Sequence, residues 1–194
     1  MSASTGLAWA DDPEGWVAGA HRLDSPHHDE RPAEAVIELL VIHHISLPPG
    51  RFSGDAIARL FTGTLDTSAH PFFAQLAGLR VSAHFLIRRR GELLQFVATA
   101  HRAWHAGVSR FAGRERCNDF SIGVELEGDG VHPFTGAQYR RLAQLTRLLA
   151  ARHPLRWLAG HSDIAPGRKQ DPGPFFEWSR FEASVGEAGL RRNG

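Results

Sequence analysis

Residues 160–174 combine His161, Lys169 and Asp171 with several glycine and proline residues. The glycines and prolines argue against a long helix or strand, so we expect a loop, where site residues concentrate on rigid scaffolds. Lys169 and Asp171 would point the same way in an extended segment, which Pro172 favours for Asp171. A cation and a carboxylate would then face one spot, and His161 reaches it if the loop folds back. A solvated surface loop is the alternative interpretation.

Two histidines and an aspartate are the candidate ligands of a catalytic zinc ion. Such an ion typically keeps three protein ligands and one open position. His43 lies near the end of a strand-like apolar run, and His161 and Asp171 lie in the predicted loop. Two neutral imidazoles and one carboxylate would leave a net charge of about +1, which favours ionisation of a bound water toward a pKa of about 7. Taken singly, each histidine fits a structural role better.

Glu125 and Lys169 complete a set of residues suited to metal-assisted hydrolysis of an amide or ester. Glu125 stands in the middle of a predicted strand, a rigid position that suits a general base and acid. Lys169 would stabilise the oxyanion that develops on an attacked carbonyl group. Considered singly, Glu125 is more simply interpreted as a solvent-exposed glutamate and Lys169 as a surface lysine. Only their combination with the candidate ligands points to hydrolysis.

Other classes of enzyme fit the sequence less well. It contains neither a Walker loop nor the glycine fingerprint of a dinucleotide-binding fold, and no serine stands in the context of a nucleophile elbow. Cys117 is a candidate nucleophile for which no base is assigned.

The composition narrows the choice of partners and compartment. The 194 residues include 22 Lys and Arg and 21 Asp and Glu, a balance that gives no case for nucleic acid or an anionic membrane as partner. The single cysteine excludes an internal disulfide and suits a reducing compartment. The first residues do not form a signal peptide, and no stretch is long enough to cross a membrane. We therefore expect a cytoplasmic protein.

Apolar periodicity predicts a single α/β domain with a central mixed β-sheet flanked by helices. Strands are expected at residues 39–45, 121–128 and 156–159, a hairpin at 81–97, and helices at 54–63, 135–153 and 175–185. Thr135 and Gln138 match a capping box at the start of the longest helix. We expect an extended N-terminal arm over residues 1–35, the catalytic domain over 36–186 and a C-terminal tail over 187–194.

Five segments, taken in order, resemble the cytosolic 1,6-anhydro-N-acetylmuramyl-L-alanine amidases of the wider zinc amidase and peptidoglycan-recognition superfamily. These segments are residues 40–50, 80–87, 102–107, 114–128 and 160–174. The resemblance runs from about Trp16 to about Phe181, nearly the whole chain. It implies that residues 36–186 form a zinc amidase domain with a central mixed sheet.

By matching motif positions, the resemblance implies the same site as the chemistry of the residues. The implied zinc ligands are His43, His161 and Asp171, with Glu125 as the catalytic carboxylate and Lys169 as the oxyanion stabiliser. The implied reaction is hydrolysis of the amide between the lactyl group of N-acetylmuramic acid and L-alanine. The preferred substrate would be the 1,6-anhydro muropeptide of cell-wall recycling, with an indirect influence on β-lactamase induction.

Further residues in these motifs are candidates for substrate contacts. The stem peptide of the implied substrate is acidic, so Arg80, Arg116 and Arg168 are natural clamps. Trp104 and His105 would form a wall on the sugar side, although a packing role is equally open. The expected partner is this small muropeptide, and we expect a monomer.

The sequence departs from the family pattern at two positions. His44 stands where we expect asparagine, and Gln170 stands where threonine is usual. His44 would compete with His43 as a ligand or alter substrate contacts. Because neighbouring strand residues point to opposite faces, His43 is kept as the ligand and His44 as a candidate substrate contact.

Two other functions remain open from the sequence. Members of the superfamily that lack a zinc ligand bind peptidoglycan fragments without cutting them, but Asp171 is present here. The other alternative is an amidase that acts on intact cell wall outside the cytosol, against which the missing signal peptide argues.

Overall fold

Two long neighbouring strands, β5 (Leu39–Ile45) and β11 (Ser121–Glu127), form the centre of the sheet in this computed structural model, which describes residues 6–192. They pair in parallel, and β11 is buried along its whole length. Parallel strands covered on both faces read as nearly continuous apolar runs, which explains the sequence of β5. The expected strands at residues 39–45 and 121–128 are thereby confirmed.

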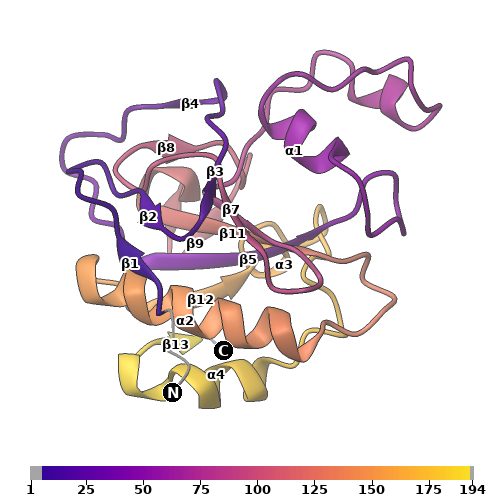
Figure 1. The fold of residues 1–194 in the computed structure, drawn as a ribbon. Helices are drawn as coiled ribbons and strands as arrows, with labels where there is room; N and C mark the ends of the chain where they lie inside the picture. The colour runs from indigo at the N-terminus through magenta and orange to yellow at the C-terminus, as the bar shows by residue number, and fades with distance from the viewer. Residues whose placement is uncertain (1–5, 193–194) are drawn as a thin grey trace.

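The whole sheet is mixed and has seven strands (Figure 1). Its order is β13 (Arg191–Arg192), β12 (Trp157–Gly160), β5, β11, β6 (Phe85–Ile87), β7 (Leu93–Gln95) and β3 (His21–Arg22). All neighbours are parallel except β6 and β7, which form the antiparallel hairpin predicted within residues 81–97. The predicted fold class, a single α/β domain with a central mixed sheet, is confirmed.

Helices α2 (Gly136–Arg152) and α4 (Trp178–Val185) cover one face of the sheet, in orange and yellow in Figure 1. The capping box of Thr135 and Gln138 forms as predicted, because each residue satisfies a backbone N–H of the other. Leu142 and Leu145 of α2 are fully buried against the sheet. The long helix therefore packs on the face of the sheet opposite His43 and Glu125. Of the candidate site residues on the central strands, only His44 belongs to the face under the helix.

Alternation along the central strands divides their side chains between two layers. Leu40 and Ile42 of β5 belong to the core under α2, whereas Leu39 and Val41 belong to a smaller apolar cluster on the opposite face. His43 follows the second set, because side chains two residues apart share a face. The opposite face also carries α1 (Ala56–Phe61) and a second apolar cluster around it.

The remaining elements are short. Three two-stranded ribbons pair β1 (Ala8–Trp9) with β2 (Val17–Ala18), β4 (His28–Asp29) with β8 (Arg102–Ala103), and β9 (Arg110–Phe111) with β10 (Arg114–Glu115). Single turns of helix are α3 (His161–Ile164) and the 3-10 helices η1 (Phe73–Leu76), η2 (Cys117–Phe120) and η3 (Gly186–Ala188). None of the helices within residues 6–192 has the length and apolar character needed to cross a membrane.

The expected N-terminal arm and the expected C-terminal tail each contribute an edge strand to the sheet. β3 lies within the expected arm, residues 1–35, and forms one edge strand; β13 lies within the expected tail, residues 187–194, and forms the other. Trp16 and Val17 of the arm are buried. Residues 1–5 and 193–194 lie outside the described part of the chain.

His153, at the C-terminal end of α2, packs against the N-terminal ribbon. Its Nε2 lies 3.0 Å from Thr99 Oγ1, and its ring stands edge-on to Trp9 with the centroids 6.0 Å apart. Burial lowers the pKa of His153 to about 4. The folded protein therefore holds this imidazole neutral at pH values where the unfolded chain would protonate it.

We predict that His153 makes stability depend on acidity. Its pKa is about 4 when folded and about 6.5 when unfolded, so its contribution is present above pH 6.5 and is lost as the pH falls toward 4. The slope is up to about 1.4 kcal/mol per pH unit for one histidine. Urea denaturation at several pH values measures the free energy of unfolding, which should change less steeply with pH in His153→Gln than in the wild type. An equal dependence on pH in the two proteins would contradict the assignment.

Candidate active site

Parallel strand register brings the candidate residues onto one face of the sheet. Glu125 on β11 is the register partner of His43 on β5. Gly160, the last residue of β12, pairs with Ile42, so His161 follows directly beside His43. The carboxyl ends of parallel strands meet at one edge of a sheet, which is where ligands bind in open α/β folds.

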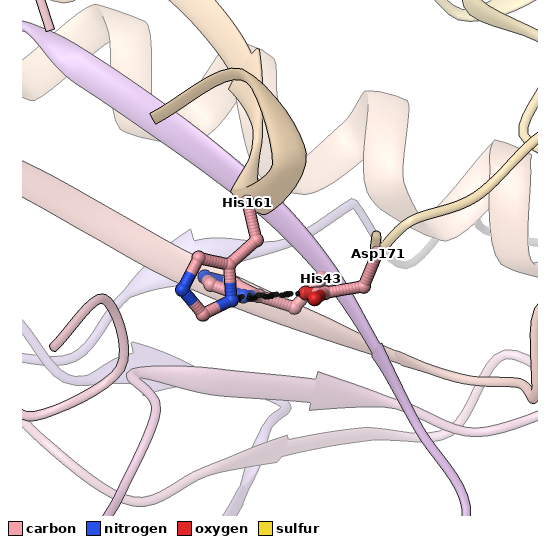
Figure 2. Close-up of side chains that lie close together, drawn as sticks. All are labelled: His43, His161 and Asp171. Carbon is pink, nitrogen blue, oxygen red and sulfur yellow. Dashed lines mark hydrogen bonds and ion pairs between the residues drawn. The ribbon is translucent and has the colours of Figure 1, made fainter. Parts of the chain in front are cut away.

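His43, His161 and Asp171 converge on one point (Figure 2). His43 Nδ1 lies 3.0 Å from His161 Nδ1 and 3.0 Å from Asp171 Oδ2, and His161 Nδ1 lies 3.1 Å from the same oxygen. Both rings are buried. Within residues 6–192 this is the one group of three such side chains with ligand atoms inside 4.8 Å of one another.

The outer nitrogens of both rings are already engaged. His161 Nε2 donates to the carbonyl oxygen of Ala106 at 3.1 Å, and His43 Nε2 lies 2.9 Å from His105 Nδ1. Burial lowers the pKa of His43 to about 4, so its ring is neutral near pH 7. Two imidazole nitrogens and a carboxylate oxygen that converge on one point form a donor set that can hold a cation, so the cluster is compatible with a metal site.

The loop that carries Asp171 folds back onto the end of β12, as the sequence required for a shared site. Ser162 N–H donates to Asp171 O at 2.9 Å. A Cβ atom on Gly160 would lie 2.6 Å from Pro172 Cδ, so only glycine allows this approach without displacement. The close packing of Gly160 against Pro172 therefore places Asp171 beside His161.

Glu125 is buried, unlike the solvent-exposed glutamate of the simpler interpretation. Its side chain is 9% exposed, and Oε2 has no hydrogen-bond partner among the described residues. Burial, together with the negative charge of Asp171, raises the pKa of Glu125 well above its usual range, while Lys169 acts in the opposite direction. An unpaired, readily protonated carboxyl group beside a metal-ligating cluster is suited to proton transfer.

A cavity of about 270 Å³ opens over the cluster. Glu125, His161, Lys169 and Asp171 line its polar side, with Lys169 exposed. The cavity also has an apolar wall, which includes Leu47, Phe72, Leu76, Leu79, Val81 and Trp104. Apart from Trp104, sequence reasoning missed this wall, because most of its members come from irregular segments that carry no distinctive pattern.

The structure does not bring the three predicted arginine clamps into this cavity. Arg80 borders a neighbouring cavity of about 190 Å³, and Arg116 and Arg168 line a third one of about 620 Å³. Arg168 donates to the carbonyl oxygens of Ala106 and Val108 at 2.8 and 2.5 Å. Peptide binding by these arginines stays a prediction.

Two other residues predicted to contact the substrate, Trp104 and His44, border the cavity. Trp104 lines the cavity and donates its indole N–H to Asp29 Oδ1 at 3.0 Å. His44 borders the same cavity, but its ring leans on the next loop, where a Cβ atom on Gly130 would lie 3.0 Å from its Nε2. His44 therefore does not join the cluster of candidate ligands, as the strand alternation predicted.

Comparison with known proteins agrees with this geometry. Residues 33–174 match the N-acetylmuramoyl-L-alanine amidase family. The chain belongs to this family.

Relatives of this amidase include 1,6-anhydro-N-acetylmuramyl-L-alanine amidase AmpD of Escherichia coli K12, which is 58% identical over 174 residues, 89% of this chain and 95% of the relative. A crystal structure of a Se-Met AmpD derivative superposes with a TM-score of 0.86 at 57% identity, covering 89% of this chain and 97% of that one. A complex of E. coli AmiD with the substrate anhydro-N-acetylmuramic acid-L-Ala-D-gamma-Glu-L-Lys has a TM-score of 0.57 at 29% identity, covering 95% and 66%.

We predict that Asp171→Ala will lose bound metal. Removing one of three candidate ligands should weaken the affinity for a metal ion more than about 100-fold, beyond the usual cost of outer-shell changes. Competition with a chromogenic chelator measures the affinity, and Asp66→Ala is the control because Asp66 is exposed and its carboxylate bonds to Ser68, outside the cluster. Unchanged affinity in Asp171→Ala would exclude Asp171 as a ligand.

Proposed function

We propose that this protein is a zinc-dependent amidase that cleaves the lactyl–L-alanine amide bond of 1,6-anhydro-N-acetylmuramyl peptides during peptidoglycan recycling. The observation that carries the proposal is the cluster of His43, His161 and Asp171 with buried Glu125 beside it. The names of the relatives support the choice of substrate, since AmpD acts on anhydro-muramyl-L-alanine compounds and AmiD was solved with an anhydro-muropeptide.

The three ligands fit zinc better than a harder cation. Two imidazole nitrogens and one carboxylate oxygen form a common catalytic zinc set, whereas magnesium and calcium prefer oxygen ligands. A zinc ion held there would act as a Lewis acid and promote the ionisation of water. The residues around it determine where the proton and the charge then go.

Glu125 accepts the proton of the attacking water and returns it to the leaving amine of L-alanine. It stands on β11, which is buried along its whole length, so its position is fixed. The same burial that raises its pKa favours keeping the proton until the amine departs. Glu125 thus serves as base in the first step and as acid in the second.

Lys169 supplies positive charge to the oxygen of the attacked carbonyl group. It is the only lysine in the chain, among many arginines. A compact ammonium group on a flexible stem can approach a developing oxyanion as a point charge, which a planar guanidinium cannot imitate. Its place on the cavity wall with Glu125 and Asp171 supports this role.

The apolar wall is suited to the rest of the substrate. Trp104 and the other apolar side chains of the wall present a surface for the sugar ring and the alanine methyl group. Contacts of Arg80, Arg116, Arg168 and His44 with the substrate remain part of the proposal. So do a cytoplasmic location, a monomeric state and an indirect influence on β-lactamase induction.

We predict that Glu125→Gln will lower kcat/KM by a factor of about 10² to 10⁴, the usual contribution of general acid–base catalysis, while zinc remains bound. Mass spectrometry of the peptide released from purified anhydro-muropeptide measures the rate. Glu127→Gln is the matched control, because Glu127 is buried on the same strand face but bonds to Arg89 N–H and does not line the cavity. Normal turnover by Glu125→Gln would refute the role given to Glu125.

For Lys169 we predict a loss in kcat rather than a rise in KM, because its contact with the oxyanion exists only in the transition state. Lys169→Met should lower kcat by about 10² to 10³, the usual cost of losing one oxyanion donor. Lys169→Arg keeps the charge and should recover only part of the rate. If Lys169→Met raises KM alone, the lysine binds substrate and does not stabilise the transition state.

A further inference from the structure

We propose that Ser121, His105 and Asn118 act as positioning residues that determine which nitrogen of each ligand histidine carries its proton. None of the three belongs to the ligand cluster. They hold the protons of His43 and His161 on Nε2, so both Nδ1 lone pairs face the metal position. The inference rests on the proposed metal site, but the proton positions can be measured without a metal.

The first part of the network begins at a backbone carbonyl group, which can accept a hydrogen bond but cannot donate one. The carbonyl oxygen of Cys117 lies 2.6 Å from Ser121 Oγ, so the serine hydroxyl donates to it. Ser121 Oγ must then accept its other hydrogen bond, at 3.1 Å, from His105 Nε2. This places the proton of His105 on Nε2 and leaves Nδ1 as an acceptor.

The same direction continues to the ligand. His105 Nδ1, now an acceptor, lies 2.9 Å from His43 Nε2, so His43 donates from Nε2. Its Nδ1 lone pair then points toward His161 and Asp171. Ser121, His105 and His43 are all buried, so water does not compete for these bonds. Each proton position follows from the one before it.

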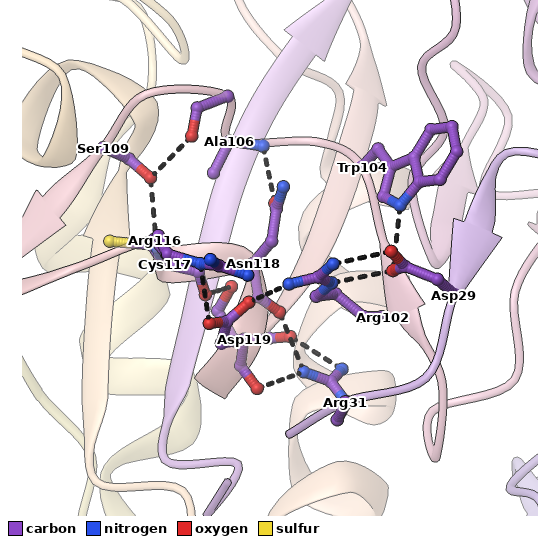
Figure 3. Close-up of polar contacts among 12 residues, drawn as sticks. Asp29, Arg31, Arg102, Trp104, Ala106, Ser109, Arg116, Cys117, Asn118 and Asp119 are labelled. Carbon is purple, nitrogen blue, oxygen red and sulfur yellow. Dashed lines mark hydrogen bonds and ion pairs between the residues drawn. The ribbon is translucent and has the colours of Figure 1, made fainter.

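The second ligand histidine is controlled by the residue next to His105. His161 Nε2 donates to the carbonyl oxygen of Ala106, which again leaves Nδ1 free. Asn118 Oδ1 accepts the backbone N–H groups of both His105 and Ala106, at 3.2 and 2.8 Å (Figure 3 shows the bond to Ala106). One asparagine therefore holds the segment that supplies the acceptors for both ligand rings.

The shape of β11 gives an independent indication of this role. A Cβ atom on Gly123 would lie 2.4 Å from His105 Cγ. The backbone of Gly123 is not in the left-handed region, so conformation does not require glycine here. The glycine instead leaves room for the imidazole of His105 to lie across the strand between Ser121 and Glu125.

Arg31 of the N-terminal segment stabilises the turn at residues 118–121, which carries Asn118 and Ser121. Its guanidinium donates to the carbonyl oxygens of Asn118, Asp119 and Ser121 at 3.0, 3.0 and 2.9 Å (Figure 3). Burial lowers the pKa of Arg31 to about 10, which still leaves it charged near neutral pH. These charge-assisted bonds fix the backbone that presents Asn118 and Ser121 to the network.

These contacts also bear on His105, for which the sequence left a place in the sugar-side wall and a packing role equally open. The ring borders the cavity, but Nδ1 and Nε2 are occupied by His43 and Ser121. No ring nitrogen is left for a sugar hydroxyl. His105 therefore holds His43 by a hydrogen bond, and only the edge or face of its ring is available to the sugar-side wall, which stays a prediction.

The test measures zinc affinity and proton positions in the same set of variants. Chelator competition should show zinc binding weakened about 10-fold or more in Ser121→Ala and Asn118→Leu, the usual cost of an outer-shell change. Asn118→Asp keeps the acceptor oxygen and should bind zinc close to the wild-type level. Ser25→Ala is the matched control, because Ser25 is also a buried serine that donates to a carbonyl and accepts an N–H, but away from both ligands.

Two-dimensional ¹⁵N–¹H spectra of the imidazole rings read the proton positions directly. His105 should carry its proton on Nε2 in the wild-type protein, with or without zinc, and should populate the Nδ1 form in Ser121→Ala. A proton on Nδ1 of His105 in the wild type, or wild-type zinc affinity in both Ser121→Ala and Asn118→Leu, would overturn the inference.

These outcomes separate the inference from the proposed function. If the wild-type protein bound no zinc but His105 kept its proton on Nε2 and lost that preference in Ser121→Ala, the metal site would fail and the network would stand. If zinc bound and drove catalysis in the wild type, but the variants changed neither affinity nor tautomer, the amidase would stand and the network would fail.

Discussion

The parallel register of β12, β5 and β11 is the constraint on which the site depends. It places His161, His43 and Glu125 side by side on one face, at the edge where three strands end. A shift of one residue in either pairing would turn a ligand or the glutamate to the opposite face. The apolar residues that alternate with them pack under α2, so the same packing that stabilises the sheet also holds this register.

Burial then gives the site its chemical character. The pKa of His43 falls and that of Glu125 rises for the same reason, since a low-polarity surrounding disfavours both charged forms. The result is a neutral imidazole that can ligate a cation and a carboxyl group that can exchange a proton. Lys169 lies at the exposed rim, where its charge costs little desolvation.

The loops around the sheet complete the site because glycine lets them approach closely. Gly160 admits Pro172 and so positions Asp171, while Gly123 admits the ring of His105 behind His43. The N-terminal segment contributes through Arg31 and Asp29, which bond to the turns carrying Asn118 and Trp104. Segments that looked peripheral in the sequence therefore support the residues nearest the reaction.

By itself, the sequence determined the α/β class, the two central strands, the hairpin, the capped long helix and the candidate ligands, because periodicity and motif spacing are local properties. The strand pairing of both chain ends and the burial of Glu125 could not be read from it, because they depend on residues far apart in the chain. The same holds for the apolar wall, the displacement of the three arginines from the cavity, and the roles of Ser121 and Asn118. A hydrogen-bond direction such as that from His43 through His105 and Ser121 to Cys117 exists only once three separate segments are packed together, so only the tertiary structure decided it.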